Sequence, residues 1–432
     1  MISNPSPSID RLAGINLYAT SSQGIGGSIK KKNEDFQVKE LLSSKYLASI
    51  QKVQDDTHIF PFYQLEKNGI DSAHAIFLIR RRTGIILKIV GLKDAKATTI
   101  QYATSNRFKK GTKQTIKDFT TNQIKLTLLG FAKRPIGKNF LIGNAFRIKI
   151  TNPLKANSKT LNNFASEIDK IGNYYGLQRF GSERLVTHLV GKSIIKRRFD
   201  EAVELLLTYT STYDTKYSKE IREKLKDVKN NPSLLEQIPK GMDIERNLAR
   251  EIINGSESIK VLRTVPITIR RLFVQAYQAY LFNRTLSTAI ENEFSLIIPK
   301  DGDLCFDINK NDLEFGKIRK YSGSSFGKDK IQGIPVIRLP GYSFQPGKNR
   351  FDKLVREIMH EESVNSKDFF VKEMQELSEA GGFRQASYFC KDFAYFAEGE
   401  HLVIQFSAPK GTYATSLLRE LMKPPDPILA GF

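Results

Sequence analysis

One aspartate stands among lysines in residues 91–101, and this run holds the best candidate for chemistry in the chain. The six residues before it, 85–90, are mostly aliphatic, which predicts a buried strand that ends where the run begins. Asp94 should therefore lie in the turn just past a strand end. Lys93 and Lys96 flank it, and cations that close favour the ionised carboxylate. We expect Asp94 to be a persistent anion that can act as a nucleophile rather than as a general acid.

An aspartate after a glycine is more often a turn or helix-cap residue than a catalyst, so Asp94 needs support from the rest of the sequence. Lysine and arginine number 67 against 46 aspartates and glutamates, which gives a formal net charge of +21. Such an excess is typical of proteins with a polyanionic partner. Nucleic acid is favoured over a membrane surface, because no segment joins a strong apolar face to a lysine-rich one. Adaptation to the ionic conditions of the host stays open, and composition does not separate RNA from DNA.

Length and composition exclude several other classes of protein. A chain of 432 residues is long enough for two domains or slightly more. It has no run of about 18 apolar residues and no secretory signal pattern at its start, so we expect a cytoplasmic protein without membrane contact. Cys305 and Cys390 lie far apart, and the five histidines lack the spacing of a zinc-binding helix. We therefore expect no metal and no cofactor.

Residues 91–101 read Gly-Leu-Lys-Asp-Ala-Lys-Ala-Thr-Thr-Ile-Gln. They resemble the signature of the TruD family of pseudouridine synthases, a Gly-x-Lys-Asp turn followed by Ala, Thr and Gln. Other matching segments follow in order along the chain, at residues 30–40, 65–69, 143–146, 173–181, 273–283 and 409–420. The resemblance implies a tRNA pseudouridine synthase that acts without a cofactor on uridine 13 of the D arm, with Asp94 as its nucleophile. Attack on the sugar and attack on the base ring both stay open.

The segment 30–40 resembles a family motif in which a lysine is followed by Pro-Glu-Asp-Phe-x-Val, with Asn33 here in place of the proline. By this resemblance Lys30 binds in the active site beside Asp94, where a cation holds the carboxylate ionised and oriented. Lys31 and Lys32 follow directly, so a slip of one residue stays open. Without the resemblance, three consecutive lysines are typical of a solvated face.

Residues 173–181 read Asn-Tyr-Tyr-Gly-Leu-Gln-Arg-Phe-Gly and resemble the family's Asn-Tyr-Phe-Gly-x-Gln-Arg-Phe-Gly. An enzyme that works on a base takes it out of the stack and holds it against a flat surface, which suits the ring of Tyr175. The hydroxyl that replaces the family's phenylalanine needs a partner or a role in proton transfer. We expect Asn173 to bind the flipped base or to orient Asp94. Core packing at a helix end is the alternative for both tyrosines.

The resemblance also implies a mixed α/β (α+β) fold. Its catalytic pseudouridine synthase domain, built on an antiparallel sheet, would comprise residues 1–194 and 385–432. A TRUD insertion domain would occupy residues 195–384. Within this plan, we expect residues 1–28 to be an N-terminal extension that ends in a flexible glycine-rich turn. Residues 208–241 are polar and poor in aliphatic side chains, and we expect them to form a surface insertion of exposed helices.

The expected partner is tRNA, bound by a monomer that needs no small-molecule cofactor. We expect Lys67 to be structural or to face RNA, and His188 to be buried or to contact RNA. Two other functions stay open. An RNA-binding protein with a degenerate active site is disfavoured by the intact residues Lys30, Asp94 and Asn173 and by the aromatic ring at position 175. A nuclease would need clustered carboxylates for metal, and none is found near Asp94.

Overall fold

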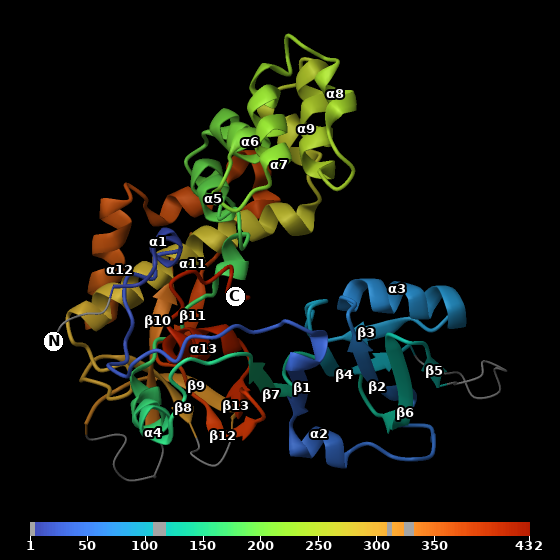
Figure 1. Cartoon of the computed structure of the whole chain (residues 1–432), viewed down its shortest axis with the longest axis vertical. Coiled ribbons are helices and arrows are strands. Elements are labelled where there is room, and N and C mark those ends of the chain that lie inside the picture. The colour runs from blue at the N-terminus through green and yellow to red at the C-terminus, as the bar shows by residue number, and fades with distance from the viewer. Residues whose placement is uncertain (1–4, 107–117, 309–312, 324–331) are drawn as a thin grey trace.

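The computed structural model describes residues 5–106, 118–308, 313–323 and 332–432, and it confirms the mixed α/β fold (Figure 1). The strands are β1 (Phe36–Leu42), β2 (Phe60–Asn68), β3 (Leu87–Ile89), β4 (Thr98–Ser105), β5 (Phe119–Thr120), β6 (Ile124–Ala132), β7 (Leu141–Ile150), β8 (Leu304–Ile308), β9 (Phe315–Lys320), β10 (Gln332–Leu339), β11 (Gly382–Gln385), β12 (Lys391–Glu398) and β13 (His401–Pro409).

Helices surround these strands. The α-helices are α1 (Ser8–Leu12), α2 (Ser44–Ala48), α3 (Ser72–Thr83), α4 (Ser158–Glu167), α5 (Thr187–Ile195), α6 (Phe199–Thr208), α7 (Lys216–Lys224), α8 (Leu234–Gln237), α9 (Asp243–Ile253), α10 (Ser258–Arg263), α11 (Ile267–Glu291), α12 (Arg350–Glu361) and α13 (Ala414–Met422). Short 3-10 helices include η3 (Leu177–Phe180). Among the residues described, no helix has the length and apolar character that a membrane crossing requires.

The larger sheet joins the two ends of the chain. Its strand order is β12-β13-β7-β1-β4-β2-β6-β5. Strand β3 lies off this path and pairs with β4. The pairs are antiparallel except for β1 with β4, where Gln37 lies opposite Thr98. Because β12 and β13 come from residues 391–409 and pair beside β7, the C-terminal part of the chain completes a sheet that the N-terminal part begins.

The second sheet and most of the helices belong to the middle of the chain. The smaller sheet has the order β11-β10-β8-β9, and the long helix α11 packs against α5, α12 and β10. A Cβ atom at Gly191 would lie 2.0 Å from the carbonyl oxygen of Phe273, so the glycine permits the close approach of α5 to α11. In Figure 1, helices α6–α9 form a lobe that stands away from the larger sheet.

The expectation of exposed surface helices at 208–241 holds only in part, because the segment forms short helices with many exposed residues but also contributes to the core. Ile221, Leu225, Leu234 and Ile238 are buried in the same core as α5 and α11. Ile221 and Leu234 lie in α7 and α8, and Leu225 and Ile238 directly follow these helices. Each pair is four residues apart, so each short amphipathic helix turns one face toward the core. A low content of aliphatic residues therefore does not exclude a helix face that packs into the core.

The N-terminal segment is likewise not a flexible extension. The N–H groups of Ile25 and Gly26 donate to the carbonyls of Leu421 and Met422 at 3.0 and 2.9 Å, and Ile25 is fully buried. Gly27 has φ +85°, and a Cβ atom there would lie 2.9 Å from the oxygen of Thr151. The glycine-rich stretch is thus a closely packed strap across α13, and its glycines serve close approach rather than mobility. Residues 1–4 lie outside the described part of the chain.

Helix α3 and strand β3 precede the 91–101 run. Helix α3 begins at an Asp71 cap, whose carboxylate accepts from the N–H of His74, and ends at Gly84 with φ +76°. The buried strand expected at 85–90 is shorter, since within the described ranges only Leu87–Ile89 forms a strand, which pairs with β4. Leu87 is buried but Ile86 is 45% exposed, because an edge strand leaves one side to solvent.

Candidate active site

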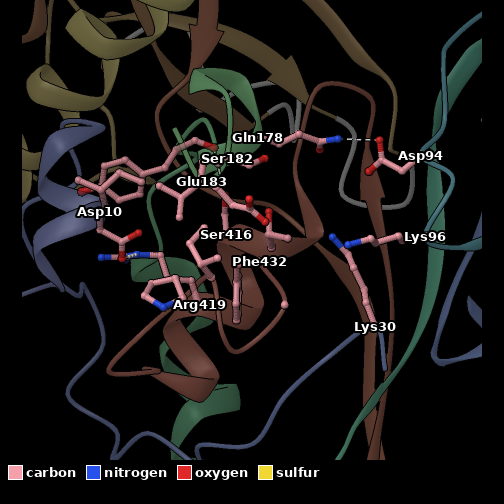
Figure 2. A pocket seen from close by; sticks show the side chains of 18 of the residues that line it. Asp10, Lys30, Asp94, Lys96, Gln178, Ser182, Glu183, Ser416, Arg419 and Phe432 are labelled. Carbon is pink, nitrogen blue, oxygen red and sulfur yellow. Dashed lines mark hydrogen bonds and ion pairs between the residues drawn. The ribbon is translucent and has the colours of Figure 1, made fainter. Parts of the chain in front are cut away.

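A cavity of about 340 Å³ lies where the N-terminal segment, the loop between β3 and β4, η3 and the C-terminal residues meet (Figure 2). Its charged lining residues are Asp10, Lys30, Asp94, Lys96, Glu183 and Arg419. Tyr174, Leu177, Ile428 and Phe432 supply apolar surface. The structure thus brings Lys30 and Asp94, which are 64 residues apart in the sequence, to one cavity.

The Asp94 side chain is exposed at the mouth of this cavity. Its Oδ1 accepts a hydrogen bond of 2.6 Å from Nε2 of Gln178, which comes from η3. Figure 2 shows the side chains of Lys30 and Lys96 pointing toward the same region below the carboxylate. One carboxylate is therefore oriented by a neutral donor in a cavity that two lysines also line.

Lys30 has an unusual backbone for a lysine, with φ +57°. Its half-buried amino group lies 5.0 Å from the centre of the Phe36 ring. Burial lowers the pKa of this amino group, the charge of Asp94 opposes that effect, and Lys96 adds to it. Because a left-handed backbone is unfavourable for any residue with a Cβ atom, the surrounding structure must hold Lys30 in place.

The backbone of the Asp94 loop is held from below by Lys67 of β2. The Lys67 amino group donates to the carbonyl oxygens of Ile70, Lys93 and Asp94, at 2.8, 3.2 and 2.8 Å. Only 2% of this lysine is exposed, and burial lowers its pKa to about 8. Of the two roles that the sequence allowed for Lys67, the structural one is confirmed.

Gln101, the last residue of the 91–101 run, closes the loop from the other side. Its Nε2 donates to the oxygen of Gly91 at 2.7 Å, and its Oε1 accepts from Oγ of Ser72 at 2.6 Å. The same Ser72 oxygen accepts from the N–H of Lys93 at 2.9 Å. Beneath them, the buried Glu40 lies 3.3 Å from the Lys93 amino group. The polar residues of this motif therefore fix the loop that carries Asp94.

Asn173 and Tyr175 do not line this cavity, although Tyr174 and Gly176 beside them do. Asn173 is buried, and its Oδ1 accepts a hydrogen bond of 2.9 Å from the guanidinium of Arg384. The same guanidinium lies 3.9 Å from the centre of the Tyr175 ring. The structure thus brings Asn173 and Tyr175 together through Arg384, and it joins neither to Asp94 through a hydrogen bond.

Arg384 is a functional candidate that the sequence reasoning missed. It is almost fully buried, and its hydrogen bonds go to uncharged oxygens, the carbonyls of Asn173, Tyr174 and Gly411 and the Asn173 amide. Among the described residues it has no carboxylate partner within ion-pair distance. Its place in strand β11, within Gly-Phe-Arg-Gln, gives no local signal of this role, because every partner is distant in sequence.

Arg419 of α13, which also lines the cavity, differs from Arg384 in that it pairs with carboxylates. Its Nε donates to Asp10 at 2.6 Å and its NH1 to Glu420 at 3.2 Å, and all three side chains are buried. This cluster ties the N-terminal segment to α13. His188 is also buried, between the rings of Phe180 and Tyr280, as one of its two expected placements required.

The site contains the elements for nucleophilic chemistry on a bound anionic or polar substrate. Asp94 supplies an oriented carboxylate, and Lys30 and Lys96 supply cations beside it. Within the ranges that the structure describes, no group of three or more histidine, cysteine, aspartate or glutamate side chains is placed to hold a metal ion.

Comparison with known proteins gives a consistent result along the whole chain. Residues 12–421 match the family model described as TruD, tRNA pseudouridine synthase D. A probable tRNA pseudouridine synthase D of Thermococcus sibiricus is 32% identical over 94% of this chain and 97% of its own. The corresponding protein of Pyrococcus furiosus is 32% identical over 96% and 99%.

The fold is also similar to that of a protein with a crystal structure. The putative tRNA pseudouridine synthase D of Methanosarcina mazei superposes with a TM-score of 0.77 at 27% identity, covering 97% of this chain and 98% of that one.

Proposed function

This chain belongs to the TruD family of pseudouridine synthases, and from that premise we propose that it converts uridine 13 in the D arm of tRNA to pseudouridine, with Asp94 as the nucleophile. It is an enzyme of the isomerase class, and uridine to pseudouridine is its reaction. The position of the uridine and the identity of the nucleophile are our proposals. The proposal that Asp94 is the nucleophile rests on one observation: Gln178 orients its carboxylate in a cavity that Lys30 also lines.

The isomerisation balances within the substrate. The bond between N1 of uracil and C1′ of ribose breaks, the uracil turns, and a bond forms between C5 and C1′. The proton of C5 is lost and N1 gains one, so no oxidant, reductant or co-reactant is consumed. Asp94 would act by attack on the ribose or on the base ring, or by assisting departure of the base, and its loop is fixed at both ends to hold the carboxylate for that step.

The other proposed site residues differ in their position, since Lys30 lines the cavity and Asn173 and Tyr175 do not. Lys30 would orient the Asp94 carboxylate, and its place in the same cavity supports this role. Asn173 and Tyr175 would contact the flipped uridine only if the base reaches past Tyr174 and Gly176, because they lie behind the lining and in contact with Arg384. We therefore propose that the flipped base contacts the edge of the Tyr175 ring or the ring face that Arg384 does not cover. Asn173 would act on the base indirectly, through Arg384.

The domain plan is also a proposal. Residues 1–194 and 385–432 would form the catalytic domain, because both contribute strands to the larger sheet. Residues 195–384 would form the insertion domain, which contains the smaller sheet nearly whole, since β11 ends at Gln385. The net charge of +21 supports tRNA as the partner bound across both.

A variant at the nucleophile tests the proposal. Asp94→Asn keeps size and hydrogen bonding but removes the charge, so we expect tRNA binding to persist while pseudouridine formation falls by on the order of 10⁴-fold or more. Pseudouridine mapping on unmodified tRNA in metal-free buffer measures this, and a tRNA with cytidine at position 13 tests the site of modification.

Three outcomes would count against the proposal. If the wild type binds tRNA and modifies no uridine, a binding protein becomes the better reading. If Asp94→Asn retains activity, another residue is the nucleophile. If the wild type cuts RNA and a chelator stops it, the nuclease alternative gains support.

A further inference from the structure

Helix α3 carries a basic and aromatic outer face beside the active-site loop. Phe77 is 57% exposed, and the His74 ring contacts it edge-on at 6.4 Å between centres. Arg80 and Arg81 stand three and four residues further on and are exposed on the same face of the helix. We call His74, Phe77, Arg80 and Arg81 the α3 face.

The two arginines have no carboxylate partner in the part of the chain that the structure describes. Among the described residues, neither Arg80 nor Arg81 lies within ion-pair distance of an aspartate or glutamate. Many other arginines of this chain are paired, such as Arg147 with Glu398 at 2.6 Å. An unneutralised guanidinium beside an exposed ring is a combination that fits the phosphate and base of a nucleic acid.

The α3 face is connected to the nucleophile by a short path. Ser72 opens α3, and its Oγ accepts from the N–H of Lys93, the residue before Asp94, at 2.9 Å. At about 1.5 Å per residue, Arg80 and Arg81 lie roughly 12–14 Å along the helix axis from Ser72. That distance corresponds to about four nucleotides of one strand at roughly 3.4 Å each. A strand that places its uridine at Asp94 would therefore bring neighbouring phosphates to this face.

A simpler explanation covers only part of these observations. Basic residues in the last turn of a helix are stabilised by the partial negative charge of its C-terminus. That effect accounts for a cation at this end of α3 but not for the exposure of Phe77 one turn earlier. It also predicts a contribution to folding alone, whereas an RNA contact predicts a contribution to binding that depends on salt.

We propose that the α3 face binds the ribose-phosphate backbone of the substrate tRNA next to the target uridine, with phosphates on Arg80 and Arg81 and a base or ribose on Phe77. The proposal rests on the proposed function, because the partner is the tRNA that is modified. It adds a surface outside the cavity that fixes the position of the strand, and therefore which uridine reaches Asp94.

The test is the salt dependence of tRNA binding by Arg80→Gln/Arg81→Gln. Each phosphate contact contributes about 0.7–0.9 to the slope of log K against log salt, so we expect this variant's slope to be shallower by about 1.4–1.8. Phe77→Ala should weaken binding at every salt concentration without changing the slope, since stacking involves no counterion. Arg80→Lys/Arg81→Lys keeps the charge and should keep most of the slope.

A matched control comes from the other side of the molecule. Lys353→Gln/Arg356→Gln makes the same change in net charge on α12, which Figure 1 shows far from α3. Both of its side chains are exposed, and this variant should bind tRNA with a slope much closer to that of the wild type. Urea denaturation of all variants reports any loss of folding separately.

The outcomes separate the two proposals. If the wild type forms pseudouridine and the α3 double variant has the same slope as the α12 control, the α3 face is not a binding surface and its arginines only stabilise the helix. If the wild type forms no pseudouridine in any tRNA, the proposed function fails, whatever the slopes are.

Discussion

Lys30 is a lysine held in a backbone conformation that suits glycine. With φ +57°, its Cβ atom crowds the backbone, which costs about 1 kcal/mol or more. The amino group lies 5.0 Å from the centre of the Phe36 ring, and burial lowers its pKa while the charge of Asp94 opposes that effect. We propose that this unfavourable backbone is retained because the Lys30 side chain acts in the cavity that it lines together with Asp94.

Two substitutions at Lys30 separate these effects. Lys30→Gly and Lys30→Ala both remove the amino group, so both should lower pseudouridine formation by on the order of 10²-fold or more. Lys30→Gly also relieves the backbone, so it should be more stable than Lys30→Ala by about 1 kcal/mol. Urea denaturation and an activity assay on the same preparations measure both. Equal stability would show that the backbone stores no strain, and full activity of either variant would remove Lys30 from the site.

At the residue scale, the local sequence identified the proposed nucleophile more readily than the residues that support it. Asp94 and Lys30 belong to contiguous runs whose residue types suggest their chemistry. Gln178 bonds to Asp94 from 84 residues away, and Arg384 reaches Asn173 across 211 residues. Nothing in a short window marks such contacts, because they exist only once η3 and β11 are packed beside the loop. The surroundings of Asn173 were therefore beyond sequence reasoning.

At the scale of elements, the loop of residues 90–97 is fixed by three neighbours. Strand β2 supplies Lys67, helix α3 supplies Ser72, and strand β4 supplies Gln101. Each of these side chains is buried, and each bonds to loop backbone rather than to Asp94's carboxylate. The elements thus determine where the carboxylate sits, while its own hydrogen bond comes from η3.

Lys67→Met tests this support. The change keeps the length of the side chain but leaves the carbonyl oxygens of Ile70 and Asp94 without their Lys67 donor, while that of Lys93 keeps the N–H of Ser72. Stability should therefore fall by about 1–3 kcal/mol. The freed loop should lower activity by about 100-fold, because a misplacement of about 1 Å has that effect on a reacting group. Lys125→Met, at an exposed lysine paired with Glu66 across 3.8 Å, is the control and should leave both properties nearly unchanged.

The pH dependence of stability gives a second readout for Lys67. Its pKa is about 8 in the folded protein against 10.5 when unperturbed. Between these values the unfolded chain binds a proton that the folded chain does not, so stability of the wild type relative to Lys67→Met should rise with pH across this window. A flat difference from pH 8 to 10 would contradict the burial of a charged amine at this position.

Helix ends and strand edges were predictable to different degrees. Asp71 and Gly84 mark the ends of α3 by chemistry that operates within one turn, so these ends can be located from the sequence alone. The strap formed by residues 24–28 carries the same glycines as a flexible turn, and only its contact with α13 distinguishes the two. The short edge strand β3 shows the same limit, since burial of residues 85–90 depends on which neighbours cover them.

At the scale of the whole molecule, the two ends of the chain are joined at the base of the active site. Strands β12 and β13 complete the larger sheet, and the N-terminal segment crosses α13. Between them, Arg419 binds Asp10, 409 residues earlier, and also the adjacent Glu420. The cavity lined by Asp94 is therefore closed on one side by a contact between the first and last elements of the chain.

This buried cluster should make a large and measurable contribution to stability. Arg419→Met leaves the carboxylates of Asp10 and Glu420 buried without a cation, and we expect the free energy of unfolding to fall by about 3–5 kcal/mol. Arg198→Met removes an exposed arginine paired with Glu201 at 3.0 Å and should change stability by less than about 1 kcal/mol.

Adding Asp10→Asn to Arg419→Met should restore part of the loss, because it removes one of the two unpaired charges. Urea denaturation of the four proteins at pH 7 provides the comparison. If Arg419→Met is no less stable than Arg198→Met, or if Asp10→Asn adds a further loss in the Arg419→Met protein, the two ends of the chain are held by apolar packing rather than by this cluster.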